Sequence, residues 1–129
     1  MKAKTTKSAP TLAELQRMIR TFCNERDWDQ FHNPKDLSIS LALEAAEVME
    51  HFQWKSPEEM AEHARRHKED VADELADVFY WVLLLSNKLD VDLIEAFLRK
   101  MQKNEAKYPV AKAKGSHKKY TELAGADKA

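Results

Sequence analysis

The sequence predicts an all-α protein, and its helices favour a bundle. The chain has only two glycines and four prolines in 129 residues, too few for the tight turns that a small sheet protein needs. Apolar residues recur three and four positions apart in several segments, which is the spacing of an amphipathic helix. Four substantial helices with short connections between them are packed most economically as a four-helix bundle.

The first two helices have clear start signals. Thr11 and Glu14 form a capping box at the start of the first helix, which we expect to end near Arg26. Its apolar residues keep helical spacing, namely Leu12, Leu15, Met18, Ile19 and Phe22. The Asn-Pro pair at 33–34 starts the second helix, because Asn caps helices and Pro fits the first helical position. This helix is expected to end near residue 52.

The remaining helices are a short charged one, a long one and a fourth main helix. Ser56 starts the short helix, which has little apolar content and is expected to be peripheral. The long helix covers about residues 70–89, and the short helix either continues into it or breaks just before it. Asp92 with Glu95 opens the fourth helix, and the Tyr-Pro pair at 108–109 ends it. The apolar residues of the fourth helix are expected to face inward: Ile94, Phe97, Leu98 and Met101.

Composition limits the partners of the chain. Its 21 basic and 22 acidic residues give a formal net charge of -1, so no overall field draws it to nucleic acid or to anionic membranes. The longest apolar run, residues 78–85, is far shorter than the roughly 20 residues that span a bilayer. A single cysteine suits a reducing compartment. We therefore expect a soluble cytoplasmic protein that binds neither nucleic acid nor membrane.

The length is typical of one domain. We expect residues 1–9 to form a flexible N-terminal tail, residues 10–110 the helical domain, and residues 111–129 a basic C-terminal tail. The apolar far side of the second helix and the run 78–85 require more buried surface than one small bundle supplies. The sequence therefore predicts an oligomer.

Two acidic pairs stand out on otherwise apolar helices. Glu44 and Glu47 are neighbours on one face of the second helix, and Glu74 and Asp77 are neighbours on the long helix. If the two helices pack side by side, the four carboxylates converge and raise one another's pKa unless cations neutralise them. Oxygen ligands select a hard ion, Mg²⁺ or Mn²⁺. The pattern alone leaves open that both pairs lie on solvated helix faces.

The paired motifs carry a resemblance to a known family. "EAAE" at 44–47 and "ELAD" at 74–77 resemble the ExxE and ExxD signature of the all-α nucleoside triphosphate pyrophosphohydrolases, the MazG-like and dUTPase-like superfamily. The segments "ERDWDQFHNPKDL", "FQWKSPEE", "KMQKNEAKYP" and "KKYTEL" are similar to the dCTP pyrophosphatase branch. The resemblance covers roughly residues 11–123.

The resemblance implies a fold, a reaction and an assembly. The fold is a four-helix-bundle-type MazG-like fold in a dimer or tetramer. The reaction is Mg²⁺-dependent cleavage of a nucleoside triphosphate to the monophosphate and pyrophosphate, with Mn²⁺ as a possible substitute. The branch implies dCTP or a modified dCTP as substrate, and hence a role in keeping non-standard nucleotides out of the pool.

The resemblance also assigns site residues. Those that hold Mg²⁺, one of which also orients or deprotonates the attacking water, are Glu44, Glu47, Glu74 and Asp77. Those expected to bind the substrate are Trp28, His32, Trp54, Lys103, Asn104, Lys107, Tyr108, Ser116, Lys119 and Tyr120. Aromatic faces stack on a nucleobase, so Phe31 is a further candidate for the base pocket, and the alternative for these loop aromatics is core packing. Lysines with an asparagine suit phosphates. The alternative for the lysines is a solvated helix C-terminus, where the helix dipole favours cations.

Three positions depart from the family pattern. His51 stands where relatives tend to be apolar, and Ile19 stands where some carry a polar residue in the base pocket. Trp81 replaces a more usual aliphatic residue and is interpreted as core packing. The departures at His51 and Ile19 bear on the base preference.

Other functions remain alternatives at this stage. The chain is alternatively a non-catalytic helical oligomerisation or binding module, whose acidic faces pair with basic helices of a partner. Such a module would show no Mg²⁺-linked gain in melting temperature. A ferritin-like di-iron bundle needs a Glu-x-x-His motif on each of two helices, and no histidine lies three residues after Glu74.

Overall fold

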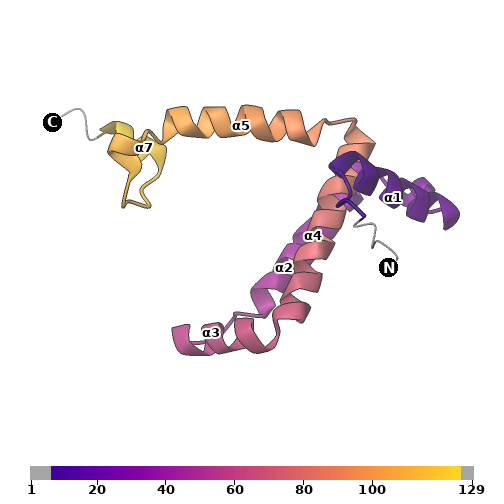
Figure 1. Ribbon diagram of the computed structural model, residues 1–129, viewed down its shortest axis with the longest axis horizontal. Helices are drawn as coiled ribbons and strands as arrows, with labels where there is room; N and C mark the ends of the chain where they lie inside the picture. The colour runs from indigo at the N-terminus through magenta and orange to yellow at the C-terminus, as the bar shows by residue number, and fades with distance from the viewer. Residues whose placement is uncertain (1–6, 126–129) are drawn as a thin grey trace, which may run out of the picture. The chain divides into compact units, whose positions relative to one another are not determined.

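The computed structural model describes residues 7–125, and within this range every regular element is helical (Figure 1). The elements are α1 (Leu12–Glu25), the 3₁₀ helix η1 (Asp29–Phe31), α2 (Pro34–Glu50), α3 (Pro57–Arg66), α4 (Lys68–Leu89), α5 (Leu93–Lys107), α6 (Val110–Ala113) and α7 (Tyr120–Gly125). The predicted all-α class is confirmed. Among the described residues, no helix is long and apolar enough to cross a membrane.

The helices begin where their capping residues predict. The Thr11 hydroxyl accepts a hydrogen bond from the Glu14 N–H at 3.2 Å, and the Glu14 carboxylate accepts one from the Thr11 N–H at 2.8 Å. At the start of α2 the Asn33 side chain accepts from the N–H of Asp36 at 2.9 Å. These bonds satisfy backbone donors that have no partner inside the helix. Because α3 ends at Arg66 and α4 begins at Lys68, they are separate helices.

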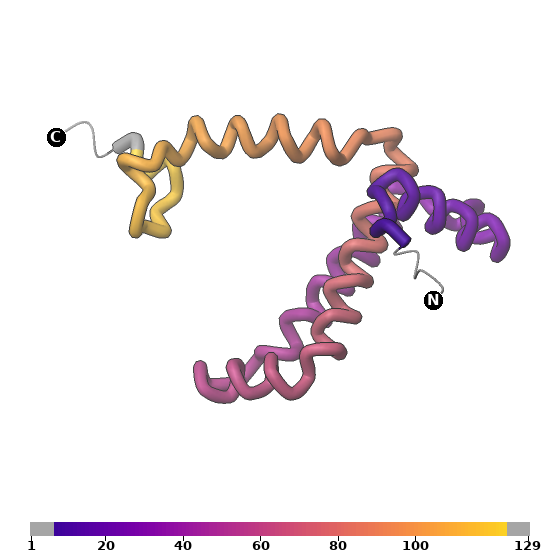
Figure 2. The backbone as a smooth tube through the Cα atoms, viewed as in Figure 1, coloured from indigo at the N-terminus to yellow at the C-terminus, as the bar shows by residue number. Residues whose placement is uncertain are grey.

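The chain forms two units, one ending at Asp90 and one beginning at Val91. In the first unit α4 is the central helix, and α1, α2 and α3 each pack against it. Figure 2 shows α2 and α4 side by side. The small buried core lies between α1, α2 and α4 and contains Ile19, Cys23, Leu37, Leu83 and Leu84.

Polar contacts also join α1 to α4. The Gln16 amide donates to the Ser86 hydroxyl at 3.1 Å, and the Asn87 amide donates to the Gln16 carbonyl at 3.2 Å. The thiol of Cys23 lies 3.4 Å from the Tyr80 hydroxyl. These pairs hold α1 across the second half of α4, next to the point where the acidic pairs meet.

The second unit consists of α5, α6 and α7. The segment that we predicted to be a basic tail therefore contains two short helices, while residues 126–129 lie outside the described residues. More than half of each of Ile94, Phe97 and Leu98 on α5 is exposed in the single chain. That the apolar residues of α5 face inward stays a prediction. Since α5 belongs to the second unit, the four-helix bundle stays a prediction.

Candidate metal centre and substrate cavity

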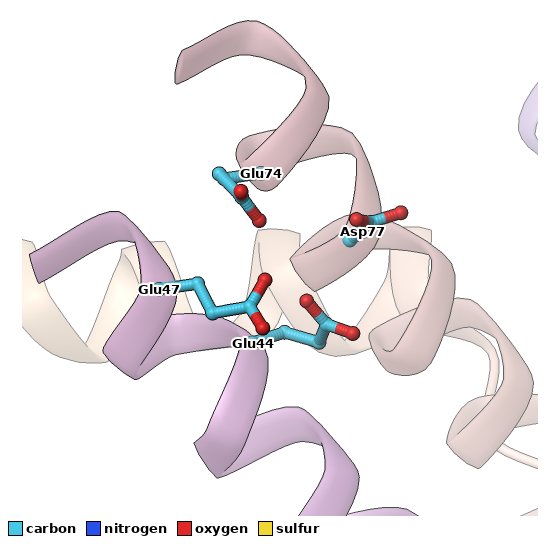
Figure 3. Close-up of side chains that lie close together, drawn as sticks. All are labelled: Glu44, Glu47, Glu74 and Asp77. Atoms are coloured by element: carbon cyan, nitrogen blue, oxygen red, sulfur yellow. The ribbon is translucent and has the colours of Figure 1, made fainter. Parts of the chain in front are cut away.

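The packing of α2 on α4 brings the two acidic pairs together. Glu44 and Glu47 project from one face of α2 because they lie three residues apart, and the same spacing aligns Glu74 and Asp77 on α4. Each of the four offers an oxygen, and these oxygens all lie within 4.8 Å of one another. Figure 3 shows the side chains pointing toward one another from the two helices. We call these four residues the carboxylate cluster.

The carboxylate cluster is electrostatically crowded. Burial raises the pKa of Glu44, and a hydrogen bond and charge repulsion from Glu47 add to the rise. The pKa of Glu47 is raised first by its hydrogen bond with Glu74. Burial raises the pKa of Asp77, and the charge of Glu44 raises it further. A cation bound between the carboxylates would offset the repulsion that raises these three pKa values.

Two oxygens of the cluster also lack partners. Within the described residues, Oε2 of Glu44 and Oε2 of Glu74 are buried and accept no hydrogen bond. An unpartnered buried carboxylate oxygen is costly, so such atoms are usually explained by an ion or a water. A set of carboxylate oxygens without histidine or cysteine suits Mg²⁺ or Mn²⁺ better than zinc or copper. The residues therefore fit a hard divalent cation.

An open cavity of about 450 Å³ adjoins the cluster. Its lining comes from α1, the loop after α1, α2 and α4, and consists of Met18, Ile19, Phe22, Trp28, Glu44, Asp77, Tyr80 and Trp81. Most of these side chains are apolar or aromatic, whereas Glu44 and Asp77 belong to the carboxylate cluster. A mainly apolar cavity with a few polar groups on one wall is typical of a small-molecule site.

The residues predicted to bind the base lie in different surroundings. Trp28 lines the cavity and packs its ring edge-to-face on Phe22, with centroids 5.6 Å apart. The His32 ring packs edge-to-face on the Trp81 ring, with centroids 6.5 Å apart. The buried Nδ1 of His32 has no hydrogen-bond partner within the described chain. Trp54 is 92% exposed in the turn after α2 and does not line the cavity.

The residues predicted to bind phosphates belong to the second unit. Lys103, Asn104 and Lys107 lie on α5, and Tyr108 caps its C-terminus. The Lys107 ammonium lies 4.7 Å from the ring centroid of Tyr120, which also packs against Tyr108. The Ser116 hydroxyl accepts from the N–H of Lys118 at 3.2 Å, and Lys119 precedes α7. Their role in substrate binding stays a prediction.

Sequence reasoning missed part of the cavity wall. Tyr80 was not singled out, and Trp81 was interpreted as core packing, yet both line the cavity. A hydrogen bond from the Trp81 side chain lowers the pKa of Glu44 and partly opposes the effect of burial. The available signal was helical spacing, because Trp81 lies four residues after Asp77 and thus on the same face of α4.

Comparison with known proteins identifies the family. The model of the MazG-like family matches residues 39–123. The dCTP pyrophosphatase 1 of Rattus norvegicus is 42% identical over 116 residues, which cover 88% of this chain and 68% of the relative. The human dCTP pyrophosphatase 1 is 40% identical over 116 residues, with the same coverage of 88% and 68%.

A solved structure agrees with these relatives. The crystal structure of a pyrophosphatase from Archaeoglobus fulgidus superposes with a TM-score of 0.74 at 40% identity, covering 82% of this chain and 99% of that one. The predicted resemblance is thus confirmed, as is the reaction class of a nucleotide pyrophosphohydrolase, and the non-catalytic module is not favoured. The chain therefore belongs to the MazG-like family.

Proposed function

We propose that this nucleotide pyrophosphohydrolase converts dCTP, or a modified dCTP, to the monophosphate and pyrophosphate, and so removes unwanted nucleotides from the cellular pool. The observation that carries the proposal is the convergence of four carboxylates beside an aromatic-walled cavity. The curated relatives named dCTP pyrophosphatase 1 support the choice of base.

The carboxylate cluster would hold Mg²⁺, with Mn²⁺ as a possible substitute. When bound, such a cation offsets the charge of the triphosphate and lowers the pKa of its bound water. Glu44 and Glu74 each contribute an otherwise unpartnered oxygen. One of the four carboxylates would also orient the attacking water or take its proton.

The cavity would take the nucleoside. Trp28 and Trp81 offer ring faces or edges to a base, and a volume of about 450 Å³ suits a ligand of nucleoside size. Glu44 and Asp77 belong to both the cavity wall and the cluster, so a nucleoside bound there has its phosphates close to the cation. His32, with its unpartnered Nδ1, is a candidate for reading a polar edge of the base.

The residues of the second unit would bind the phosphates. This part of the proposal depends on the resemblance and on the chemistry of the side chains. Ammonium and amide groups donate hydrogen bonds to phosphate oxygens. The proposed contacts come from Lys103, Asn104, Lys107, Tyr108, Ser116, Lys119 and Tyr120.

We further propose that the protein is a homodimer or tetramer. Apolar side chains on α2 and α4 have exposed fractions of 45–70%, namely Ile39, Leu43, Met49, Leu75 and Phe79. So many exposed apolar residues on two neighbouring helices indicate an interaction surface. A second copy of the chain would cover them. Sedimentation of the protein as a monomer at micromolar concentration would contradict this assembly.

The reaction is tested by measuring pyrophosphate release from a panel of canonical and modified nucleoside triphosphates, with Mg²⁺ and with EDTA. We expect release with Mg²⁺ only and the highest kcat/KM for dCTP or a modified dCTP. Release from another base would correct the substrate and keep the reaction. Absence of release across the panel would contradict the reaction itself.

A cytoplasmic location fits the nucleotide substrate and the single free cysteine.

A further inference from the structure

A line of histidines leads from the carboxylate cluster to α3. His51, at the C-terminus of α2, places its Nε2 3.9 Å from Oε1 of Glu74. On the other side of the same ring, Nδ1 of His51 lies 2.8 Å from Nε2 of His63. The ring of His63 stacks on that of His67, with centroids 4.6 Å apart and planes inclined by 24°. His67 in turn contacts Asp70 at 3.1 Å.

The contact between His51 and His63 restricts where protons sit. Two ring nitrogens 2.8 Å apart share one proton, so one ring donates and the other accepts. If His51 is neutral and receives that bond at Nδ1, its own proton is on Nε2, which faces Glu74. If His51 is charged, it donates from Nδ1 and still carries a proton on Nε2. The remaining arrangement would aim a bare nitrogen lone pair at a carboxylate and is unfavourable.

The His51 ring is also confined. Its side chain is 17% exposed and that of Glu74 is 24% exposed. The centroid of the His51 ring lies 6.4 Å from that of Phe52 and 5.1 Å from that of His63. With Nδ1 held by His63, the ring has little freedom to turn its N–H away from Glu74.

The two oxygens of Glu74 therefore have different surroundings. Nε2 of His51 lies 3.9 Å from Oε1, which is the distance of an ion-pair contact and is longer than a hydrogen bond. Glu47 also bonds to the Glu74 carboxylate, whereas Oε2 is buried and has no hydrogen-bond partner among the described residues. Groups placed beside one carboxylate oxygen favour the rotamer that presents the other oxygen to a cation. Mg²⁺ is strict about ligand geometry, so a partner that orients a ligand affects its affinity.

We propose that His51 and His63 are positioning residues for Glu74, with His63 holding the ring of His51 and His51 holding Oε1 of Glu74. This inference depends on the proposed function, because it takes the carboxylate cluster as the Mg²⁺ site. It extends the site by twelve residues along the chain to α3, a helix that has no member in the cluster or the cavity wall.

The test compares single variants of the full-length protein by Mg²⁺ titration calorimetry without nucleotide, and by melting temperature in EDTA. We expect His51→Ala and His63→Ala to weaken Mg²⁺ binding about 10-fold, as is typical when the partner of a metal ligand is removed. His63→Gln retains an N–H donor and should restore most of the affinity. His67→Ala removes the ring stack on His63 and the contact with Asp70, but leaves the contacts of His51 with His63 and Glu74 in place. It is the control, with affinity close to that of the unchanged protein.

A second measurement does not depend on the variants folding. A long-range ¹H–¹⁵N NMR spectrum of the unchanged protein reports which ring nitrogens carry protons. Protonated Nε2 on His51 supports the proposal. A bare Nε2 on His51 would overturn it, and so would a folded His63→Ala that binds Mg²⁺ as tightly as the unchanged protein.

Different results would contradict the proposed function and the positioning role. If the unchanged protein neither binds Mg²⁺ nor releases pyrophosphate, the proposed function is wrong and this inference with it. If the unchanged protein does both and the histidine variants bind Mg²⁺ normally, only the positioning role is wrong.

Discussion

The carboxylate cluster in the first unit and the cationic residues of the second unit were assigned by the same resemblance, but they differ physically. The cluster is unfavourable without a cation, because the pKa of Glu44, Glu47 and Asp77 is raised and two oxygens lack partners. Lysines near the end of α5 are favourable without any ligand, because cations stabilise a helix C-terminus. A feature that destabilises the isolated fold is stronger support for a binding site than one that stabilises it.

The largest effect is expected from the cluster itself. Glu47→Gln and Asp77→Asn should each lower kcat/KM more than about 100-fold, since loss of a ligand should exceed the loss of its outer partner. Each should also raise the melting temperature in EDTA, because one repelling charge is gone. Pyrophosphate release and thermal melting check both results.

Glu50→Gln is the matched control, since Glu50 is an exposed acid on α2 outside the cluster. It should keep nearly full activity. Full activity in both Glu47→Gln and Asp77→Asn would show that the cluster is a solvated face after all.

The next effect concerns the cavity that adjoins the cluster. Trp28→Ala should raise KM for the nucleotide about 10-fold, because stacking of a base on an aromatic ring contributes roughly 1–3 kcal/mol. Trp28→Phe should recover part of the loss. Phe31→Ala is the control, because Phe31 is exposed in η1 and does not line the cavity. Equal KM values for Trp28→Ala and Phe31→Ala would contradict the proposal that the base binds in this cavity.

Substitution of the α5 lysines should change the kinetics less than substitution of the cluster or the cavity wall. Lys103→Ala and Lys107→Ala are expected to raise KM roughly 5- to 10-fold with a smaller change in kcat, as charge-assisted hydrogen bonds to phosphate are lost. Their melting temperatures should fall slightly, because a cation that stabilises the C-terminus of α5 is lost. Lys100→Ala, on the same helix, is the control. If all three variants behave alike in steady-state kinetics, the lysines are a solvated helix end.

The comparison also shows what the sequence predicts well. Helix starts depend on local bonds, so Thr11 with Glu14 and Asn33 could be recognised directly, and the structure places the caps there. The two acidic pairs were visible because helical spacing aligns residues three apart. The two pairs meet because α2 packs on α4. The sequence did not predict this packing, and the convergence of the pairs was expected only if it occurred.

Features that depend on packing between distant segments were harder to predict. The cavity wall combines Phe22 of α1 with Tyr80 and Trp81 of α4, and apolar spacing alone does not separate a core residue from a wall residue. His63 lies in a helix with little apolar content, so no periodic signal pointed to its contact with His51. The exposure of Trp54 likewise depends on the turn after α2 and on any second copy of the chain.

The smallest expected effect is the contribution of the cluster to the pH dependence of stability. Because the pKa of Glu44, Glu47 and Asp77 is higher in the folded chain than in the unfolded chain, folding favours their protonated forms. Their contribution to stability is complete below about pH 4, where the unfolded groups are protonated. It is lost as pH rises through the raised values. In EDTA the melting temperature should therefore fall by a few degrees over this range, more in the unchanged protein than in Glu47→Gln. Saturating Mg²⁺ at neutral pH should reverse the difference, since the cation stabilises the ionised cluster and only the unchanged protein offers all four ligands. Parallel pH profiles for the two proteins would mean that the four carboxylates repel one another too weakly to require a cation.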